Sequence, residues 1–191
     1  MGRVIEILTN PVTAILKAKK EKNLNKTLLI LILSWVIVSI GFFFVFYKTT
    51  TILFTIGSVL TVFLFGILFS LFYSYIIDVV MNILGGKGKY YESLTATTYS
   101  SLPISIGLLL TSIVSSIHPV LGIIGFIVIA VTTALSLSIY FRAIKEFYAT
   151  DMLITFVGFF IILYVFLIAI YISAAFSMGS TIFQLLSLKM M

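Results

Sequence analysis

Residues 27–47 read TLLILILSWVIVSIGFFFVFY and carry no charged side chain. About 20 apolar residues, each rising about 1.5 Å along a helix, are enough to cross the hydrocarbon core of a membrane. The run between Lys26 and Lys48 therefore predicts one transmembrane helix. Three longer uncharged runs follow it along the chain, so the same argument extends to most of the sequence.

Together the uncharged runs predict five membrane spans, at residues 27–47, 52–77, 94–117, 120–141 and 152–176. The run from Glu92 to Arg142 is too long for one span and is predicted to form a hairpin of two spans. The residues Ser-Ser-Ile-His-Pro at 115–119 supply its turn. The last run exceeds one span and barely fits two, so residues 177–191 are predicted to form an apolar tail at the membrane interface. A partial sixth span in this tail is the alternative.

The composition excludes a water-soluble fold. Of the 191 residues, 61% are hydrophobic and 9% are charged, whereas a soluble domain is about half apolar and about a quarter charged. The predicted fold class is an all-α, polytopic transmembrane bundle, residues 27–176, with no further domain. Cysteine is absent, and the one histidine, His118, has no potential metal ligand near it in the sequence. We therefore expect no enzyme activity, no metal and no cofactor.

The basic residues predict the orientation, because cytoplasmic loops are enriched in Lys and Arg. The segment before the first span, the second loop and the fourth loop hold ten of the twelve basic residues. These ten are Arg3, Lys17, Lys19, Lys20, Lys22, Lys26, Lys87, Lys89, Arg142 and Lys145. The N-terminus is therefore predicted to be cytoplasmic and the C-terminus to lie outside.

Residues 1–26 form a basic segment in front of the first span. Asn10, directly before a proline, is typical of a helix start, and Val12, Ile15 and Leu16 would share one face of the helix that follows. This pattern predicts an amphipathic helix on the cytoplasmic leaflet, with its lysines at anionic lipid head groups. A solvated flank that only orients the first span is the alternative.

Two predicted spans carry small residues at a four-residue spacing, which lets neighbouring helices approach closely. The stripes are Gly66, Ser70 and Ser74 in the second span and Ala130, Ala134 and Ser138 in the fourth. The same step ends on Asp78 in one helix and on Arg142 in the other. We expect these two side chains to form an ion pair at the inner membrane boundary, because an acid there is costly without a partner. Solvation of both by interfacial water is the alternative.

The loop before the third span contains Gly85, Gly86 and Gly88, which permit a sharp turn. Lys87 and Lys89 in the same loop are placed to reach lipid phosphates, and a plain re-entry turn is favoured over a dedicated phosphate site. The two small-residue stripes leave two possible roles. They would serve internal packing, or they would dock another membrane protein or a second copy.

The third span begins with many hydroxyl side chains, and Pro103 predicts a kink within it. One interpretation is hydrogen bonding between helices. The other is a polar cavity around Thr97, Thr98 and Ser101, which would suit a small permease or channel for a neutral solute. No ionisable group is predicted at the membrane midplane, which disfavours an ion-coupled pump.

Several of these residues together resemble the Yip family, the Ypt/Rab-interacting membrane proteins and their prokaryotic relatives, which share the Yip-one domain. The resemblance extends over about residues 3–172. It rests on Asn10-Pro11, Gly85-Gly86-Lys87-Gly88, Tyr90, Leu94, Tyr99-Ser100 and Pro103.

The resemblance implies a five-span protein with a cytoplasmic N-terminus and a non-enzymatic role in membrane organisation or trafficking. In the family this role involves other membrane proteins and, in eukaryotes, small GTPases. Only 26 residues precede the first span here, so GTPase binding is not expected and a prokaryotic-type member in the plasma membrane is. The expected partners are the lipid bilayer, anionic head groups, and other membrane proteins or a second copy, with no nucleic acid.

Overall fold

A computed structural model of the chain describes residues 2–47, 50–117, 121–168 and 170. The described residues form helices and connecting turns, with no strand among them. The labelled helices are α1 (Gly2–Thr9), α2 (Pro11–Glu21), α3 (Leu24–Phe46), α4 (Ile52–Ile83), α5 (Tyr90–Ile117) and α6 (Gly122–Tyr148), and a further helix covers Met152–Ile168.

Four of these helices, α3 to α6, are long and apolar enough to cross a membrane, and the helix Met152–Ile168 is a shorter apolar one. The prediction of an all-α, polytopic bundle is therefore confirmed. At one end α4 and α6 run past the predicted limits of their spans, and α5 begins before its predicted start, because a helix need not stop where the hydrocarbon ends. His118, the end of the predicted fifth span and the tail 177–191 lie outside the described residues.

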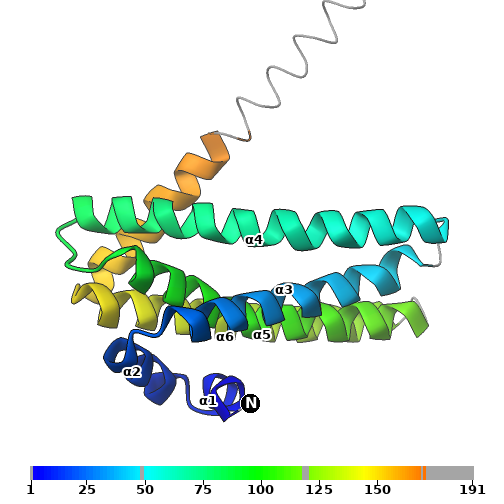
Figure 1. Cartoon of the computed structure of the whole chain (residues 1–191), viewed down its shortest axis with the longest axis horizontal. Helices are drawn as coiled ribbons and strands as arrows, with labels where there is room; N and C mark the ends of the chain where they lie inside the picture. The colour runs from blue at the N-terminus through cyan, green and yellow to red at the C-terminus, as the bar shows by residue number, and fades with distance from the viewer. Residues whose placement is uncertain (1, 48–49, 118–120, 169, 171–191) are drawn as a thin grey trace, which may run out of the picture.

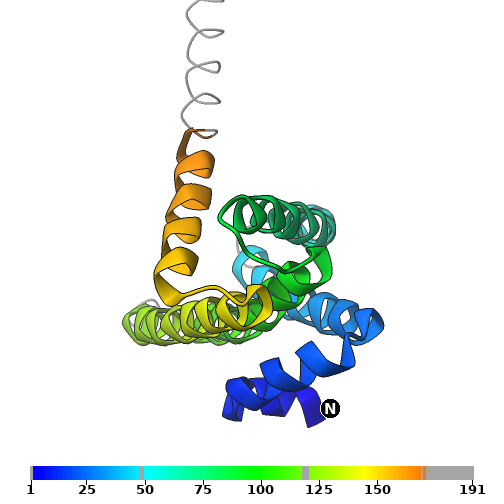
Figure 2. The same ribbon diagram turned by 90° about the vertical axis from the view of Figure 1, so that its left-hand side faces the viewer.

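The long helices lie side by side along the longest axis of the molecule (Figure 1). α5 is the central helix and contacts α3, α4 and α6. The helix Met152–Ile168 crosses the others obliquely (Figures 1 and 2). It contacts α4 through Phe166, whose ring centre is 5.8 Å from that of Tyr73, and α6 through Phe159, 6.0 Å from Tyr140.

The buried core is concentrated at one end of the bundle, where α4 and α6 finish and α5 begins. Met81, Tyr99, Ile144 and Tyr148 are almost completely buried there. Farther along, most large apolar side chains of α4 are exposed, as expected for a helix whose surroundings are lipid. The densely packed end is therefore the part of the fold that positions the polar groups described below.

The N-terminal segment forms the two helices α1 and α2, which fold back under this end of the bundle (Figure 1). Asn10 caps α2 as predicted, its side-chain oxygen accepting from the backbone N–H of Thr13 at 3.4 Å. The predicted apolar face of α2 packs mainly on the bundle and is not available to a lipid leaflet. Ile15 is completely buried in the core, and of the three predicted apolar residues only Leu16 is exposed. Protein packing and lipid contact require the same amphipathic pattern, which is why the sequence could not distinguish them.

Candidate functional site

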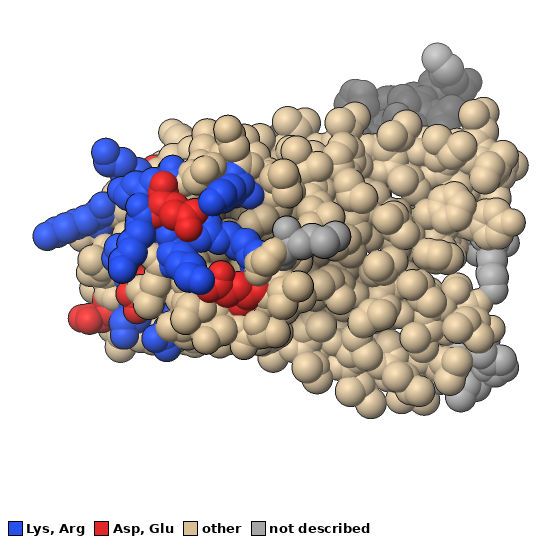
Figure 3. Space-filling view, turned by 60° about the horizontal axis from the view of Figure 1, so that its bottom comes forward, with Lys and Arg blue, Asp and Glu red and all other residues tan. Residues whose placement is uncertain are grey.

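The charged side chains gather at one end of the molecule, over α1, α2 and the adjoining ends of the long helices (Figure 3). All ten basic residues that the structure describes belong to the three segments predicted to share one side of the membrane. The rest of the surface in this view is uncharged. This charged end is the candidate functional site.

Ion pairs hold the N-terminal helices together. Arg3 donates two hydrogen bonds to the Glu21 carboxylate, at 2.8 and 3.2 Å, and Lys26 donates to the same group at 2.9 Å. Lys17 pairs with Glu6 at 2.5 Å. Because carboxylates of the protein neutralise these cations, they attract an external anionic partner less strongly than unpaired cations would.

Two further contacts attach the N-terminal helices to the bundle. The Lys22 ammonium lies 3.1 Å from the carboxylate of Glu92, a buried side chain at the start of α5. Lys19 donates to the backbone carbonyl of Glu146 near the end of α6. Together with the buried Ile15, these contacts make α1 and α2 an integral cap on the charged end, rather than a free arm.

Five cations at this end form neither an ion pair nor a side-chain hydrogen bond with any residue in the described ranges. All five are exposed. These unpaired cations are Lys20, Lys87, Lys89, Arg142 and Lys145. Exposed, unpaired ammonium and guanidinium groups are what an anionic surface or ligand attracts.

Asp78 is held by a different partner from the one predicted. Its carboxylate accepts from the Tyr148 hydroxyl at 2.7 Å and from the Asn82 amide at 3.0 Å, and no ion pair joins it to Arg142. Arg142 and Tyr148 are six residues apart on α6 and so point to different sides of that helix. Only the Tyr148 side reaches α4, and Arg142 faces outward.

The glycine loop between α4 and α5 closes over Tyr148. Gly85 has φ +87°, which L side chains rarely adopt. A Cβ on Gly86 or Gly88 would lie 2.8 or 2.6 Å from the Tyr148 ring, and the Lys87 amide donates to the Tyr148 carbonyl at 3.0 Å. The predicted sharp turn is present, and its glycines also make room for an aromatic ring. Sequence reasoning missed Tyr148, and the density of glycine in its partner loop was the only signal of it.

The hydroxyl side chains at the start of α5 join helices, in accordance with the first of the two interpretations. Ser93 donates to the Ser74 carbonyl of α4 at 2.7 Å, and the hydroxyls of Thr95 and Thr27 of α3 lie 3.3 Å apart. Tyr90 reaches the Leu71 carbonyl at 3.2 Å. The three contacts tie α5 to α3 and α4 at the charged end.

The residues proposed to line a polar cavity do not form one among the described parts of the chain. Thr97 and Thr98 are buried within the bundle, and the Thr97 hydroxyl donates to its own helix, as does that of Ser100. Ser101 borders a pocket whose other walls are mainly apolar. Tyr99 and Pro103 are buried in α5, which continues as helix through the proline.

The two small-residue stripes differ in their surroundings. Gly66, Ser70 and Ser74 are buried, and the indole N–H of Trp35 on α3 donates to the Ser70 hydroxyl at 2.9 Å. The stripe on α6, consisting of Ala130, Ala134 and Ser138, is exposed.

α6 meets α5 through another face. A Cβ on Gly107 would lie 2.0 Å from the Thr132 hydroxyl, and Thr111 donates to the Gly125 carbonyl at 2.9 Å. Of the two alternatives for Ala130, Ala134 and Ser138, internal packing does not agree with this exposure, and docking of a partner stays a prediction. A four-residue spacing of small side chains occurs on lipid-facing surfaces as well, so it does not identify the helix face that is in contact.

The N-terminal cap is expected to loosen in acid. A hydrogen bond from Lys17 holds the pKa of Glu6 below its ordinary value of 4.5, and one from Lys26, with Arg3, does the same for Glu21. A carboxyl whose pKa is lowered by folding stabilises the fold above its ordinary pKa, and this contribution is lost as the pH falls through the lowered value. Amide hydrogen exchange in α1 and α2, corrected for the intrinsic effect of pH, should therefore be slow at pH 7 and faster below pH 4.

The matched control for this prediction is the double variant Glu6→Gln, Glu21→Gln. It removes both titrating groups, so its exchange in α1 and α2 should be faster at pH 7 and nearly independent of pH. Equal acid sensitivity in the variant and the wild type would contradict the assignment of these two carboxylates.

No group of three or more His, Cys, Asp or Glu side chains that could hold a metal lies within the described residues. What the charged end offers instead is a cap fixed by ion pairs, a loop packed on Tyr148 and a set of unpaired cations. This arrangement can attract anions electrostatically.

The chain was compared with family models, with curated proteins and with solved structures. A family model described as the Yip1 domain matches residues 5–186, nearly the whole chain. Searches of curated proteins and of solved structures gave no significant match. The match includes the glycine loop, Tyr148 and the long apolar helices of a multi-pass integral membrane protein. The chain belongs to the Yip1 domain family.

Proposed function

We propose that this protein is a non-catalytic membrane organiser whose charged end faces the cytoplasm and binds anionic lipid head groups. The observation that carries the proposal is the set of five exposed, unpaired cations. A juxtamembrane Lys or Arg contributes about 1 kcal/mol of attraction to an anionic leaflet, so five of them suffice for a clear preference. The membrane proposed is the plasma membrane of a prokaryotic cell.

The proposed role works through lateral contacts in the membrane. The exposed face of α6 with Ala130, Ala134 and Ser138 would admit the close approach of another membrane protein or a second copy. The N-terminal cap supports the same proposal, because its ion pairs hold Lys20 of α2 at the same end of the bundle as the unpaired cations of the glycine loop and α6. A GTPase is not among the partners proposed.

The lipid preference can be tested with purified protein in detergent. The protein is incubated with equal amounts of phosphatidylglycerol and phosphatidylcholine, and the lipids that remain bound after re-purification are quantified. The wild type should retain an excess of phosphatidylglycerol that declines with added salt. The variant Lys87→Gln, Lys145→Gln should lose most of this excess, because it removes two of the five unpaired cations.

The matched control also removes two lysines, but from internal ion pairs. The variant Lys17→Gln, Lys26→Gln should keep most of the phosphatidylglycerol excess and show faster exchange in α1 and α2. The proposal fails if Lys87→Gln, Lys145→Gln retains the wild-type lipid ratio. It also fails if the two double variants lose the same share of the phosphatidylglycerol excess.

A further inference from the structure

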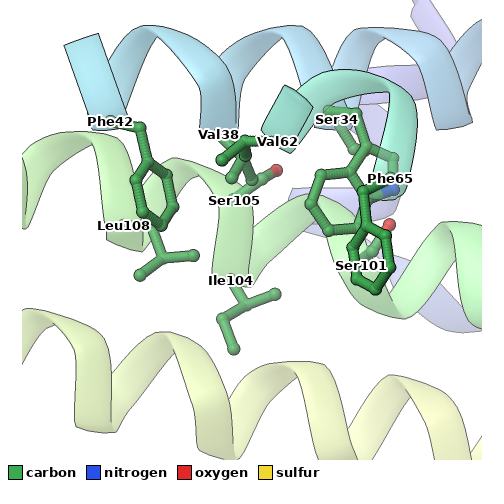
Figure 4. A pocket seen from close by; sticks show the side chains of 10 residues that line it. Ser34, Val38, Phe42, Val62, Phe65, Ser101, Ile104, Ser105 and Leu108 are labelled. Atoms are coloured by element: carbon green, nitrogen blue, oxygen red, sulfur yellow. The ribbon is translucent and has the colours of Figure 1, made fainter. Parts of the chain in front are cut away.

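A pocket of about 430 Å³ lies where α3, α4 and α5 meet, away from the charged end (Figure 4). Its size falls in the range of about 300–1,000 Å³ that is usual for small-ligand sites. Most of its wall is apolar, and all of its lining residues belong to helices long enough to cross the membrane. The main apolar side chains are Val38, Phe42, Phe65, Ile104 and Leu108.

The polar groups in the wall are already satisfied. The hydroxyls of Ser34, Ser101 and Ser105 each donate to a backbone carbonyl of their own helix, at 2.8 to 3.0 Å. The Trp35 indole N–H donates to Ser70, so the ring presents its apolar surface to the pocket. No lining residue is charged. A ligand that matches this wall has neither charge nor hydrogen-bonding groups where it is enclosed.

A second pocket adjoins the first along the contact between α3 and α4. The second pocket, of about 450 Å³, shares Phe42 and Val62 with the first and extends to Phe54 near the start of α4. Phe65 and Phe54, one in each pocket, are 66% and 58% exposed, so both pockets adjoin the apolar surface that the bundle presents to lipid. Ser58 and Thr61 also line the second pocket, and the Thr61 hydroxyl donates to the Gly57 carbonyl of its own helix at 2.9 Å. We call the two pockets together, a mainly apolar space, the α3–α4 groove.

We propose that the α3–α4 groove holds the acyl chain of a membrane lipid. An acyl chain has the required chemistry and an elongated form, and in a membrane lipid would contact the exposed apolar side chains of both helices. Apolar cavities stay free of water and take up apolar molecules, because water finds no hydrogen-bond partner in them. The proposal is separate from the head-group contact at the charged end, and either can hold without the other.

Trp35 reports on the groove directly, since it lines the pocket and is the only tryptophan of the chain. Bromine on an acyl chain quenches indole fluorescence at contact. Phosphatidylcholine with brominated acyl chains is therefore added to the protein in detergent, and Trp35 emission is followed. An occupied groove should give quenching that saturates at a low mole fraction of the brominated lipid.

The variant Val62→Phe fills the point that the two pockets share, and it should weaken the saturable quenching about tenfold, as expected for an overpacked site. Val79→Phe makes the same change on the exposed face of α4 and should leave the quenching unchanged. If Val62→Phe lowers the thermal stability, Ser101→Leu fills the pocket from α5 instead. Quenching that rises in proportion to the brominated lipid, equally in wild type and filled variants, would overturn the proposal.

Discussion

Replacing Gly66 with alanine is expected to destabilise the protein by about 1–3 kcal/mol or more, the usual range for inserting a group into a packed core. A Cβ at this position would lie 2.1 Å from the nearest ring atom of Trp35. The ring cannot shift freely, because its N–H is bonded to Ser70 on the same helix as Gly66. We expect a lower midpoint of thermal unfolding in detergent, followed by circular dichroism, together with a shift in Trp35 emission.

Gly57 provides the matched control. It lies on α4 as well, and a Cβ there would meet nothing within 4 Å. Gly57→Ala should therefore leave the unfolding midpoint unchanged or raise it slightly, since alanine favours a helix over glycine. Combining Gly66→Ala with Trp35→Leu should recover part of the loss by removing the ring. An equal effect of Gly66→Ala and Gly57→Ala would show that α4 does not pack on Trp35.

The second large effect is expected at Gly88, where a Cβ would lie 2.6 Å from two atoms of the Tyr148 ring. Gly88→Ala should push the ring away from the loop and lengthen the 2.7 Å hydrogen bond to Asp78. Loss of a hydrogen bond to a charged group costs about 1.5–3 kcal/mol, and the clash adds to it. We expect a lower unfolding midpoint and faster amide exchange in the loop 85–89.

A double-mutant cycle separates the ring contact from a general effect on the loop. In a Tyr148→Leu background the clash is gone, so Gly88→Ala should cost much less than in the wild type. Gly122→Ala is the control, because its Cβ would make only an ordinary contact, 3.9 Å from the Ser115 hydroxyl. Additive effects of Gly88→Ala and Tyr148→Leu would contradict the packing of the loop on this ring.

The positions of the membrane helices could be predicted from the sequence because they depend only on the thickness of the hydrocarbon core of the membrane. A charge-free run such as 27–47 must cross the hydrocarbon, whatever surrounds it. The burial of Gly66, Ser70 and Ser74 could also be predicted from the sequence. A stripe of small residues on a long apolar helix offers one face for close approach, and here α3 and α5 use it.

The partner of Asp78 could not be predicted, because it depends on how α6 is rotated about its own axis. Arg142 is the better electrostatic match in the sequence, but it faces outward while Tyr148 faces α4. The same rotation exposes Ala134 and places Gly125 against α5. Spacing along a chain fixes which residues share a face, and only the packing of all the helices decides which face is covered.

The cap also constrains how the chain can be made. Lys19 of α2 contacts Glu146 at a separation of 127 residues, and Ile15 shares a core with Ile144. The ribosome completes α1 and α2 long before it reaches α6, so the part of their apolar surface that packs on α6 has no native cover during most of translation. Until α6 emerges, that cover must come from the bilayer surface or a chaperone, which makes docking of the cap a late step of biogenesis.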